Sequence, residues 1–252
     1  NIERGDPDAA LAGAAVVLDA TYTTPAETHN ALEPAATIAQ WSGDDLTIYD
    51  PTQWIKGCQR TLAHFFDLDP ERVHVIAPFV GGGFGSKGWV WPSTVIAAMA
   101  AKVVGKPVKL ILDRSQFFTS NGHRTQTEQR MRVAAAPDGV LTAIVHDVLT
   151  TTGHIGDWQE ACGLVTGTLY AVPHLRVTHH TVKLDIATPT AMRAPGEATG
   201  TFALECALDE LAYAAGIDPI ELRIRNHASL DPGSGLPYSS KHLLESYREG
   251  AA

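Results

Sequence analysis

The sequence has few cysteines, and none of them occurs in a C-x-x-C pair. Only three cysteines are present among 252 residues. This sparse set excludes a disulfide framework, and it also excludes an iron–sulfur cluster or a structural zinc held by this chain's cysteines alone. We therefore predict that Cys58, Cys162 and Cys206 are small, buried side chains.

The chain also lacks long apolar runs and an excess of basic residues. No window of about 18 residues escapes interruption by charge, Pro or Gly, so no membrane span is expected. The 19 Lys and Arg residues face 28 Asp and Glu residues, and no basic stripe occurs, so nucleic acid is not an expected partner. The apolar fraction of 44% is typical of a packed domain rather than of a disordered chain.

Neither end of the sequence has the signals of a natural chain terminus. The chain starts Asn1-Ile2-Glu3-Arg4, without Met or a signal sequence, and its last residues have a helical pattern. We expect the sequence to be part of a longer polypeptide. A partner subunit with an export signal could carry this chain to the periplasm as part of a complex. Both cytoplasm and periplasm are therefore expected as alternative locations.

Hydrophobic periodicity and turn residues indicate a mixture of strands and helices. The predicted strands cover residues 11–23, 37–41, 46–49, 73–77, 107–113, 128–136, 140–149 and 175–186. The predicted helices cover residues 52–66, 92–104 and 199–215, with another starting at Asp218-Pro219. Because the helix over 92–104 is apolar on almost every side, we expect it to be buried against a sheet. A polar loop is expected over 115–127.

A glycine-rich loop follows one of the predicted strands and precedes the apolar helix. Residues 81–88 read G-G-G-F-G-S-K-G. Such a loop lets the backbone approach a ligand and point N–H groups at it, which suits an anion such as a pyrophosphate. A turn that uses glycine for positive φ is the alternative. The loop is not a Walker A motif, because Ser86 separates Gly85 from Lys87.

The same loop contains a G-x-G-x-x-G pattern, at Gly83, Gly85 and Gly88, with Asp113 at a later strand end. A nicotinamide-binding Rossmann domain is therefore a rival interpretation, although Phe84 inside the pattern fits that fingerprint poorly.

A second motif, A-M-R-A-P-G-E-A-T-G over residues 191–200, makes the interpretation sharper. Together with several other stretches, it resembles the molybdenum-binding large subunit of the xanthine dehydrogenase/aldehyde oxidase family. Among members, the sequence is most similar to bacterial aldehyde-oxidising enzymes built from three different subunits. The stretches that carry the resemblance are His29-Asn30-Ala31-Leu32-Glu33-Pro34, Tyr49-Asp50-Pro51-Thr52-Gln53, residues 81–87, Gly105-Lys106-Pro107-Val108, Asp113-Arg114, residues 191–200 and Ala207-Leu208-Asp209-Glu210-Leu211-Ala212.

The resemblance implies an α+β molybdenum-cofactor-binding domain with mixed sheets and packed helices. Two cofactor-binding subdomains are expected, residues 1–118 with the glycine loop and residues 119–252 with the second motif, the latter truncated at its C-terminus. The resemblance also implies a molybdenum–molybdopterin cofactor, in the cytosine dinucleotide form, with no protein atom bound to the metal. The implied site residues are Gln53, which would bond the apical oxygen on molybdenum, Arg193 beside the metal, and Gly82, Gly83, Phe84, Gly85 and Ala194 around the cofactor.

The implied reaction is oxidation of an aldehyde to a carboxylic acid, by attack of a metal-bound hydroxide and hydride transfer to a sulfido ligand. Two departures favour an aldehyde over a purine: Gly88 stands where purine-oxidising relatives carry Glu, and Pro195 where they carry an aromatic residue. The family's general base is a Glu in a later motif that residues 1–252 do not contain. Glu197 is an alternative base, but we interpret it as structural. This chain alone is therefore expected to be inactive.

The partners implied are an iron–sulfur subunit and an FAD subunit of the same complex, because electrons must leave the molybdenum site and this chain cannot hold those groups. Two further hypotheses remain. One is a nicotinamide-dependent dehydrogenase that uses the Gly83, Gly85 and Gly88 loop. The other is a non-catalytic assembly domain, which would hold no pterin.

Overall fold

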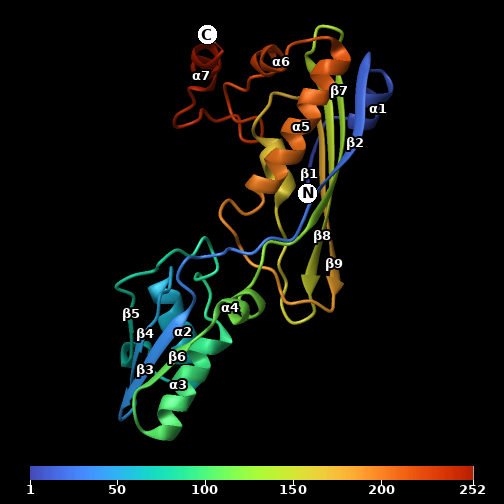
Figure 1. Ribbon diagram of the computed structural model, residues 1–252. Coiled ribbons are helices and arrows are strands. Elements are labelled where there is room, and N and C mark those ends of the chain that lie inside the picture. The colour runs from blue at the N-terminus through green and yellow to red at the C-terminus, as the bar shows by residue number, and fades with distance from the viewer. Residues whose placement is uncertain (252) are drawn as a thin grey trace. The chain divides into compact units, whose positions relative to one another are not determined.

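The computed structural model describes residues 1–251, which form two compact units (Figure 1). Unit 1 contains Asn1–Ala26, Thr125–Leu184 and Ala194–Ala252, and unit 2 contains Glu27–Arg124 and Asp185–Arg193. Two contiguous subdomains that meet at residue 118 were expected from the sequence. Each unit is instead built from segments that are not contiguous in sequence. The cause is long-range strand pairing, since the strand over Val16–Thr24 pairs with the strand over Thr127–Ala135.

Unit 1 is built on a five-stranded sheet in the order β1-β9-β8-β7-β2. All neighbouring strands are antiparallel except β8 and β9, which run parallel. Short helices α1 and α6 and a terminal helix α7 accompany the longer helix α5. The elements are β1 (Ile2–Arg4), α1 (Pro7–Ala12), β2 (Val16–Thr24), β7 (Thr127–Ala135), β8 (Leu141–Gly153), η2 (Cys162–Gly167), β9 (His174–Leu184), α5 (Glu197–Ala215), α6 (Pro219–Arg225) and α7 (Leu243–Gly250).

Helix α5 packs on β2 and β7 and closes the core of unit 1. Its Leu204, Leu208 and Leu211 are fully buried against strand residues such as Met131 and Leu175. The helix ends where Gly216 adopts a left-handed conformation, with φ of 67°. These features confirm the predicted leucine stripe and its glycine stop.

The core of unit 1 also contains a polar triad around His146 of β8, which is fully buried. Its Nε2 lies 3.1 Å from Gln129 Oε1 and its Nδ1 lies 2.8 Å from Thr166 Oγ1. Because Gln129 Oε1 only accepts, the neutral ring carries its proton on Nε2 and accepts from Thr166 on Nδ1. Burial lowers the pKa of His146 to about 4, so the ring is neutral at pH 7.

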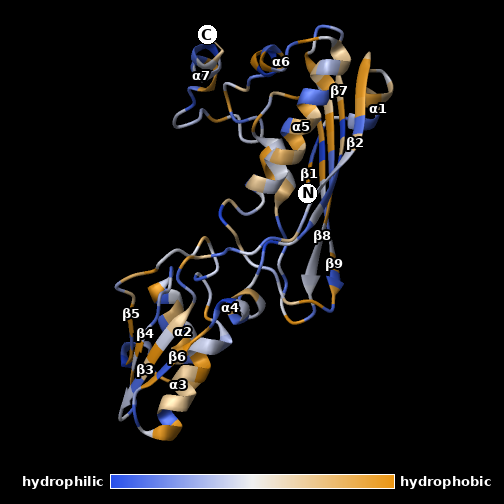
Figure 2. Cartoon of the chain, viewed as in Figure 1, coloured by the Kyte–Doolittle hydropathy of each residue, from blue (hydrophilic) through white to orange (hydrophobic). Residues whose placement is uncertain are grey.

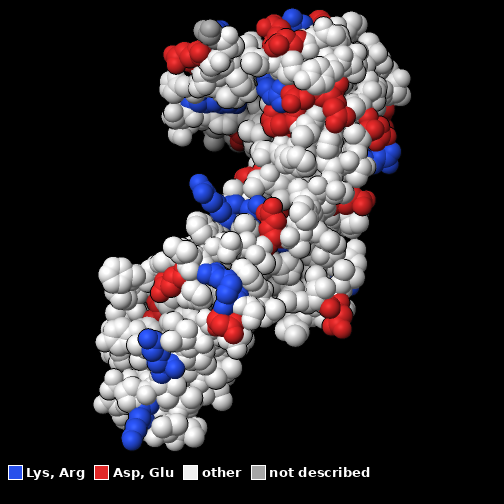
Figure 3. Space-filling model, in the orientation of Figure 1, with Lys and Arg blue, Asp and Glu red and all other residues white. Residues whose placement is uncertain are grey.

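On the other side of α5, acidic side chains gather over α5 and α6 (Figure 3). Arg223 of α6 balances part of this charge by pairing with Glu205 at 2.8 Å and with Asp209 at 2.6 Å. These ion pairs fix α6 against α5. The turn before α6 is set by Asp218, whose carboxylate accepts from the backbone N–H groups of Ile220 and Glu221, as predicted.

Unit 2 contains a four-stranded sheet in the order β5-β4-β3-β6, in which only β4 and β5 run parallel. Alternate residues of each strand point to one face, which α2 and α3 cover with Leu62, Ala97 and Ala101. In Figure 2, much of α3 and parts of the strands of unit 2 have the colour of hydrophobic residues. The elements are β3 (Ala36–Ser42), β4 (Asp45–Tyr49), α2 (Ile55–Phe66), η1 (Pro70–Arg72), β5 (Val73–Ile76), α3 (Pro92–Val104), β6 (Val108–Ile111) and α4 (Arg114–Ser120).

Three local expectations were wrong. Leu11 belongs to helix α1, because the Asp6 cap and Pro7 start a helix before the strand begins. The expected loop over 115–127 contains helix α4, which a capping box of Asp113 and Gln116 initiates. Helix α3 is buried on one side only, and on the other side its apolar side chains are exposed: Ile96 at 52%, Met99 at 48% and Val103 at 87%.

Two predictions based on absences can be compared with the described residues. No helix in residues 1–251 is long and apolar enough to cross a membrane. Cys58 and Cys162 are buried as predicted, whereas Cys206 is partly exposed, and all three are free thiols.

Candidate cofactor site

The glycine-rich loop connects β5 to α3 and folds against three other segments of unit 2. An added Cβ would lie 2.3 Å from Gln53 Oε1 at Gly83 and 2.1 Å from the carbonyl oxygen of Ala191 at Gly85. At Gly81 it would meet the Glu33 side chain at 2.1 Å. Glycine is therefore required here because the loop approaches its own chain closely. Phe84 has a left-handed backbone conformation, with φ of 55°, which is uncommon for a residue other than glycine.

Gln53 is fixed by the loop through one end of its amide group. Its Oε1 accepts hydrogen bonds from the backbone N–H of Gly85, at 2.9 Å, and of Lys87, at 3.3 Å. Because only the carbonyl end of an amide accepts, the orientation of the side chain follows from these two bonds. Its Nε2 has no hydrogen-bond partner among residues 1–251. The exposed side chain therefore presents two N–H donors from a fixed position.

Arg193 reaches the same loop through its backbone. Its N–H donates to the carbonyl oxygen of Phe84 at 2.8 Å, so the second sequence motif and the glycine loop meet within unit 2. The Arg193 side chain is exposed and its guanidinium has no ion pair or hydrogen bond within the described part of the chain. The guanidinium is thus a second unpaired donor group, carried by a residue whose backbone contacts the loop.

The backbone of the loop adds further donors. No acceptor among residues 1–251 takes a hydrogen bond from the N–H groups of Gly82, Gly83 or Phe84, although Gly83 is buried. Buried N–H groups are almost always paired, so the N–H of the buried Gly83 is notable among the three, whereas Gly82 and Phe84 are accessible to solvent. The loop has positive φ values at Gly82, Phe84 and Gly85, and successive N–H groups in such a conformation are able to line an anion-binding concavity.

Lys87 is turned into unit 2 rather than toward this donor set. Its side chain is 3% exposed, donates to the carbonyl oxygen of Val80 and pairs with Glu33 at 3.3 Å. Burial lowers the pKa of Lys87, while the charges of Glu33 and Asp50 oppose that shift. Lys87 therefore fastens the loop internally, in contrast to the phosphate-binding lysine of a Walker A motif.

Asp50, just before Gln53, is a mostly buried carboxyl group with two hydroxyl partners. Thr37 donates to its Oδ2 at 2.5 Å and Thr94 at 2.9 Å. Burial raises the pKa of Asp50, and the two hydroxyl groups oppose this shift. These bonds connect the end of β4 to β3 and α3, and so fix the turn that leads to Gln53.

The structure brings six of the seven predicted site residues together in unit 2, namely Gln53, Gly82, Gly83, Phe84, Gly85 and Arg193. Ala194, which has φ of 57°, is the first residue of the next segment of unit 1. Glu197, the alternative base, is exposed in the first turn of α5. In residues 1–251, no group of three or more His, Cys, Asp or Glu side chains could hold a metal ion.

A model of the molybdopterin cofactor-binding domain matches residues 1–227. The chain belongs to this family. It is 41% identical over 98% of its length to the aldehyde oxidoreductase molybdenum-binding subunit PaoC of Escherichia coli (strain K12), and covers 34% of that protein. It is 32% identical over 88% of its length to the putative xanthine dehydrogenase molybdenum-binding subunit XdhA of the same organism, covering 30% of it.

Solved structures agree with these sequence relationships. The aldehyde oxidoreductase from Desulfovibrio gigas superposes with a TM-score of 0.89 over 98% of this chain and 28% of that one, at 27% identity. Quinoline 2-oxidoreductase from Pseudomonas putida 86 has the same fold, with a TM-score of 0.89 at 23% identity. The predicted fold class and family are therefore confirmed. The chain spans about a third of the length of the curated relatives it matches.

The sheet of unit 2 does not have the features of a Rossmann fold. Three of its four strands are joined by antiparallel pairing, whereas dinucleotide-binding sheets are mostly parallel. The loop after β5 is also long, since β5 ends at Ile76 and α3 starts at Pro92, and it lacks the tight strand-to-helix turn of the fingerprint. These observations disfavour the nicotinamide-dependent alternative.

Proposed function

We propose that the donor set of unit 2 binds the oxygen atoms of a molybdenum–molybdopterin cofactor, in its cytosine dinucleotide form. The observation that carries this proposal is the set of unpaired donors: the Gln53 amide, the Arg193 guanidinium and the loop N–H groups. A site lined by donors suits a group rich in anionic oxygen atoms. Membership of the molybdopterin cofactor-binding family supports this choice of group.

In this proposal, each residue has a defined task. Gln53 would donate from Nε2 to an oxygen atom of the bound cofactor, while its Oε1 stays bound to the loop. The Arg193 guanidinium would donate to the bound cofactor or its substrate. Gly82, Gly83 and Phe84 supply backbone N–H groups, and Ala194 offers main-chain contact. None of these residues ligates the metal.

We further propose that the complete protein oxidises small aldehydes to carboxylic acids. The relative PaoC, named as a subunit of an aldehyde oxidoreductase, supports this substrate class. When bound, the cofactor supplies the redox chemistry, and the protein orients the substrate and excludes competing reactions. Pro195 and Gly88, where purine-oxidising relatives carry an aromatic residue and Glu, support an aldehyde over a purine. The general base, the iron–sulfur clusters and FAD would lie outside residues 1–252, the last two on partner subunits.

The proposal is tested on the full-length protein, purified with the subunits that accompany it. Molybdenum is measured by mass spectrometry, pterin by fluorescence after oxidation, and turnover with benzaldehyde and a dye acceptor. We expect about one molybdenum and one pterin per chain, together with turnover. Binding of a nicotinamide nucleotide without molybdenum would support the dehydrogenase, and absence of pterin from the whole complex would support the assembly domain.

A further inference from the structure

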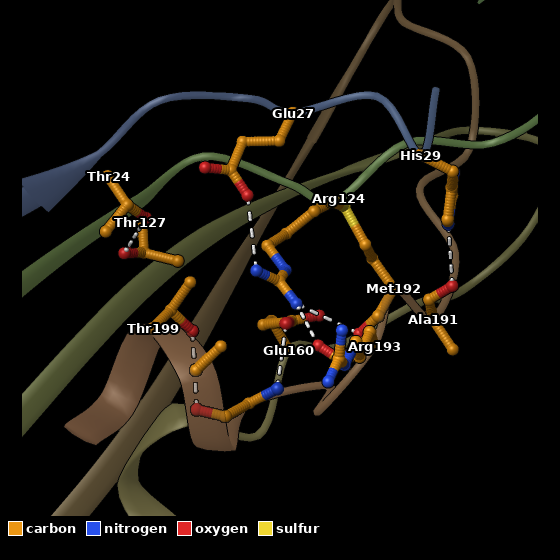
Figure 4. Close-up of polar contacts among 12 residues, drawn as sticks. Thr24, Glu27, His29, Arg124, Thr127, Glu160, Ala191, Met192, Arg193 and Thr199 are labelled. Carbon is orange, nitrogen blue, oxygen red and sulfur yellow. Dashed lines mark hydrogen bonds and ion pairs between the residues drawn. The ribbon is translucent and has the colours of Figure 1, made fainter. Parts of the chain in front are cut away.

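Residues 190–193 are held along their backbone by side chains from distant parts of unit 2. His29 Nε2 lies 2.8 Å from the carbonyl oxygen of Ala191. Arg124 Nη2 donates to the carbonyl oxygens of Met192, at 3.0 Å, and of Arg193. Three successive carbonyl groups are therefore bonded by two side chains, and Figure 4 shows His29 and Arg124 converging on this segment.

Two N–H groups of the same segment are also paired with backbone elsewhere in unit 2. Thr190 donates to the carbonyl oxygen of His123 at 2.9 Å, and Arg193 donates to that of Phe84 at 2.8 Å. The segment thus lies between the glycine loop on one side and the residues around 122–124 on the other. We call the His29 and Arg124 contacts to residues 191–193 the carbonyl clamp.

The clamp uses groups that are costly to bury. The Arg124 side chain is 7% exposed, and Glu27 pairs with it at 3.2 Å. His29 is 5% exposed, and burial lowers its pKa. Because the carbonyl oxygen of Ala191 only accepts, Nε2 carries a proton and donates to it. A buried guanidinium needs partners for its forked donors, and here the carbonyl oxygens of residues 192 and 193 take Nη2 while the Glu27 carboxylate takes Nη1. Lysine would supply the charge without the planar fork.

Arg193 depends on this clamp for its location. Its guanidinium has no partner in residues 1–251, so contacts of the side chain do not fix its position. The position of the Arg193 Cα, and with it the direction of the side chain, is set by the backbone of residues 191–193. We propose that Arg124 and His29 are positioning residues, which hold residues 191–193 so that Arg193 faces the bound cofactor. The role toward the cofactor rests on the proposed function, whereas the clamp itself does not.

The experiment compares four variants of the full-length protein in its complex. Arg124→Lys keeps the charge but loses the fork, and His29→Leu removes the donor. His29→Gln restores an N–H at a similar reach. Arg4→Lys is the matched control, because Arg4 also bonds backbone carbonyl groups, those of Val172 and Pro232, but lies in unit 1. Hydrogen exchange at residues 190–193, molybdenum content and benzaldehyde kinetics are measured for each.

We expect amide exchange at Thr190 and Arg193 to rise about tenfold in Arg124→Lys and His29→Leu. We expect kcat to fall by about 10- to 100-fold in both, with molybdenum content retained, because a displaced catalytic group lowers turnover steeply. His29→Gln should recover most of both values, and Arg4→Lys should leave them unchanged.

Unchanged exchange in both Arg124→Lys and His29→Leu would overturn the clamp. Faster exchange with unchanged kcat in a molybdenum-loaded enzyme would overturn the positioning role, as would an equal loss of kcat in Arg4→Lys. If the wild-type complex contained no molybdenum, the proposed function would fail, and the exchange data would still decide the clamp.

Discussion

Replacing Gln53 by Glu changes one atom of the side chain that the loop does not use. The carboxylate can still accept from the N–H groups of Gly85 and Lys87, which the amide oxygen now does at 2.9 and 3.3 Å. Charge-assisted bonds are stronger than neutral ones, so the free energy of unfolding should stay within about 0.5 kcal/mol of wild type. The two N–H donors on the exposed side are lost, and a negative charge replaces them.

The consequence for activity should be large. Removal of one donor that stabilises developing negative charge costs about 100- to 1000-fold in turnover, or about 3–4 kcal/mol. We expect Gln53→Glu to lose activity by this amount. Gln53→Met provides the contrast, because it also removes the acceptor of two backbone N–H groups. The N–H of Gly85 is exposed and can turn to water, whereas leaving the part-buried N–H of Lys87 unpaired costs about 1–3 kcal/mol of stability.

The assay therefore measures two quantities for each variant, the denaturant midpoint and benzaldehyde turnover per bound molybdenum. Gln53→Glu should be stable and inactive, and Gln53→Met unstable and inactive. The reasoning would be refuted by a Gln53→Glu enzyme that turns over within threefold of wild type, or by one that is destabilised as strongly as Gln53→Met.

Three other predictions concern the backbone, a buried base and the second motif. Gly85→Ala should lower the free energy of unfolding by about 2–3 kcal/mol in denaturant titrations, because φ is 108° and the Cβ would lie 2.1 Å from the Ala191 oxygen; Gly105→Ala, at φ of 65° with nothing within 4 Å, should cost only about 1 kcal/mol. The folded-state pKa of His146 lies below its usual value, so its contribution to stability is fully present above pH 6.5 and is lost as pH falls toward about 4; the slope should approach about 1.4 kcal/mol per pH unit in that window and disappear in His146→Leu. Arg193→Ala should reduce benzaldehyde turnover by about 100-fold with an unchanged melting temperature, since its guanidinium has no partner in residues 1–251; unaltered turnover would contradict its placement at the site.

Local sequence signals predicted the ends of those helices that a capping residue or a glycine bounds. Helix α3 ends at Val104 because Gly105 takes the left-handed conformation, and α6 starts at the Asp218 cap, both as predicted. Helix α4 was missed although its D-x-x-Q capping box is present in the sequence, because its polar composition hid that signal. Local signals such as caps and glycines therefore predict where most helices begin and end, but they did not reveal the polar helix α4.

The arrangement of the segments could not be predicted in the same way. Residues 1–26 join unit 1 through pairing of β2 with β7, more than 100 positions away, and this partnership leaves no periodic trace in either strand. The candidate site illustrates the same limit. Gln53 and Arg193 came from family motifs, whereas the contacts of Arg124 with residues 192 and 193 join segments that only the folded chain brings together.

The interleaving of the two units has a consequence for biosynthesis. Residues 27–124 leave the ribosome as one block and contain the whole sheet of unit 2. Residues 185–193 complete unit 2 beside the glycine loop, but they are synthesised only after β7, β8 and β9. Domains generally fold as units in the order of synthesis. Residues 185–193 are thus made late, and under the proposed function the nascent protein would lack the segment that carries Arg193 until most of unit 1 exists, so the cofactor would be loaded after translation of this region rather than during it.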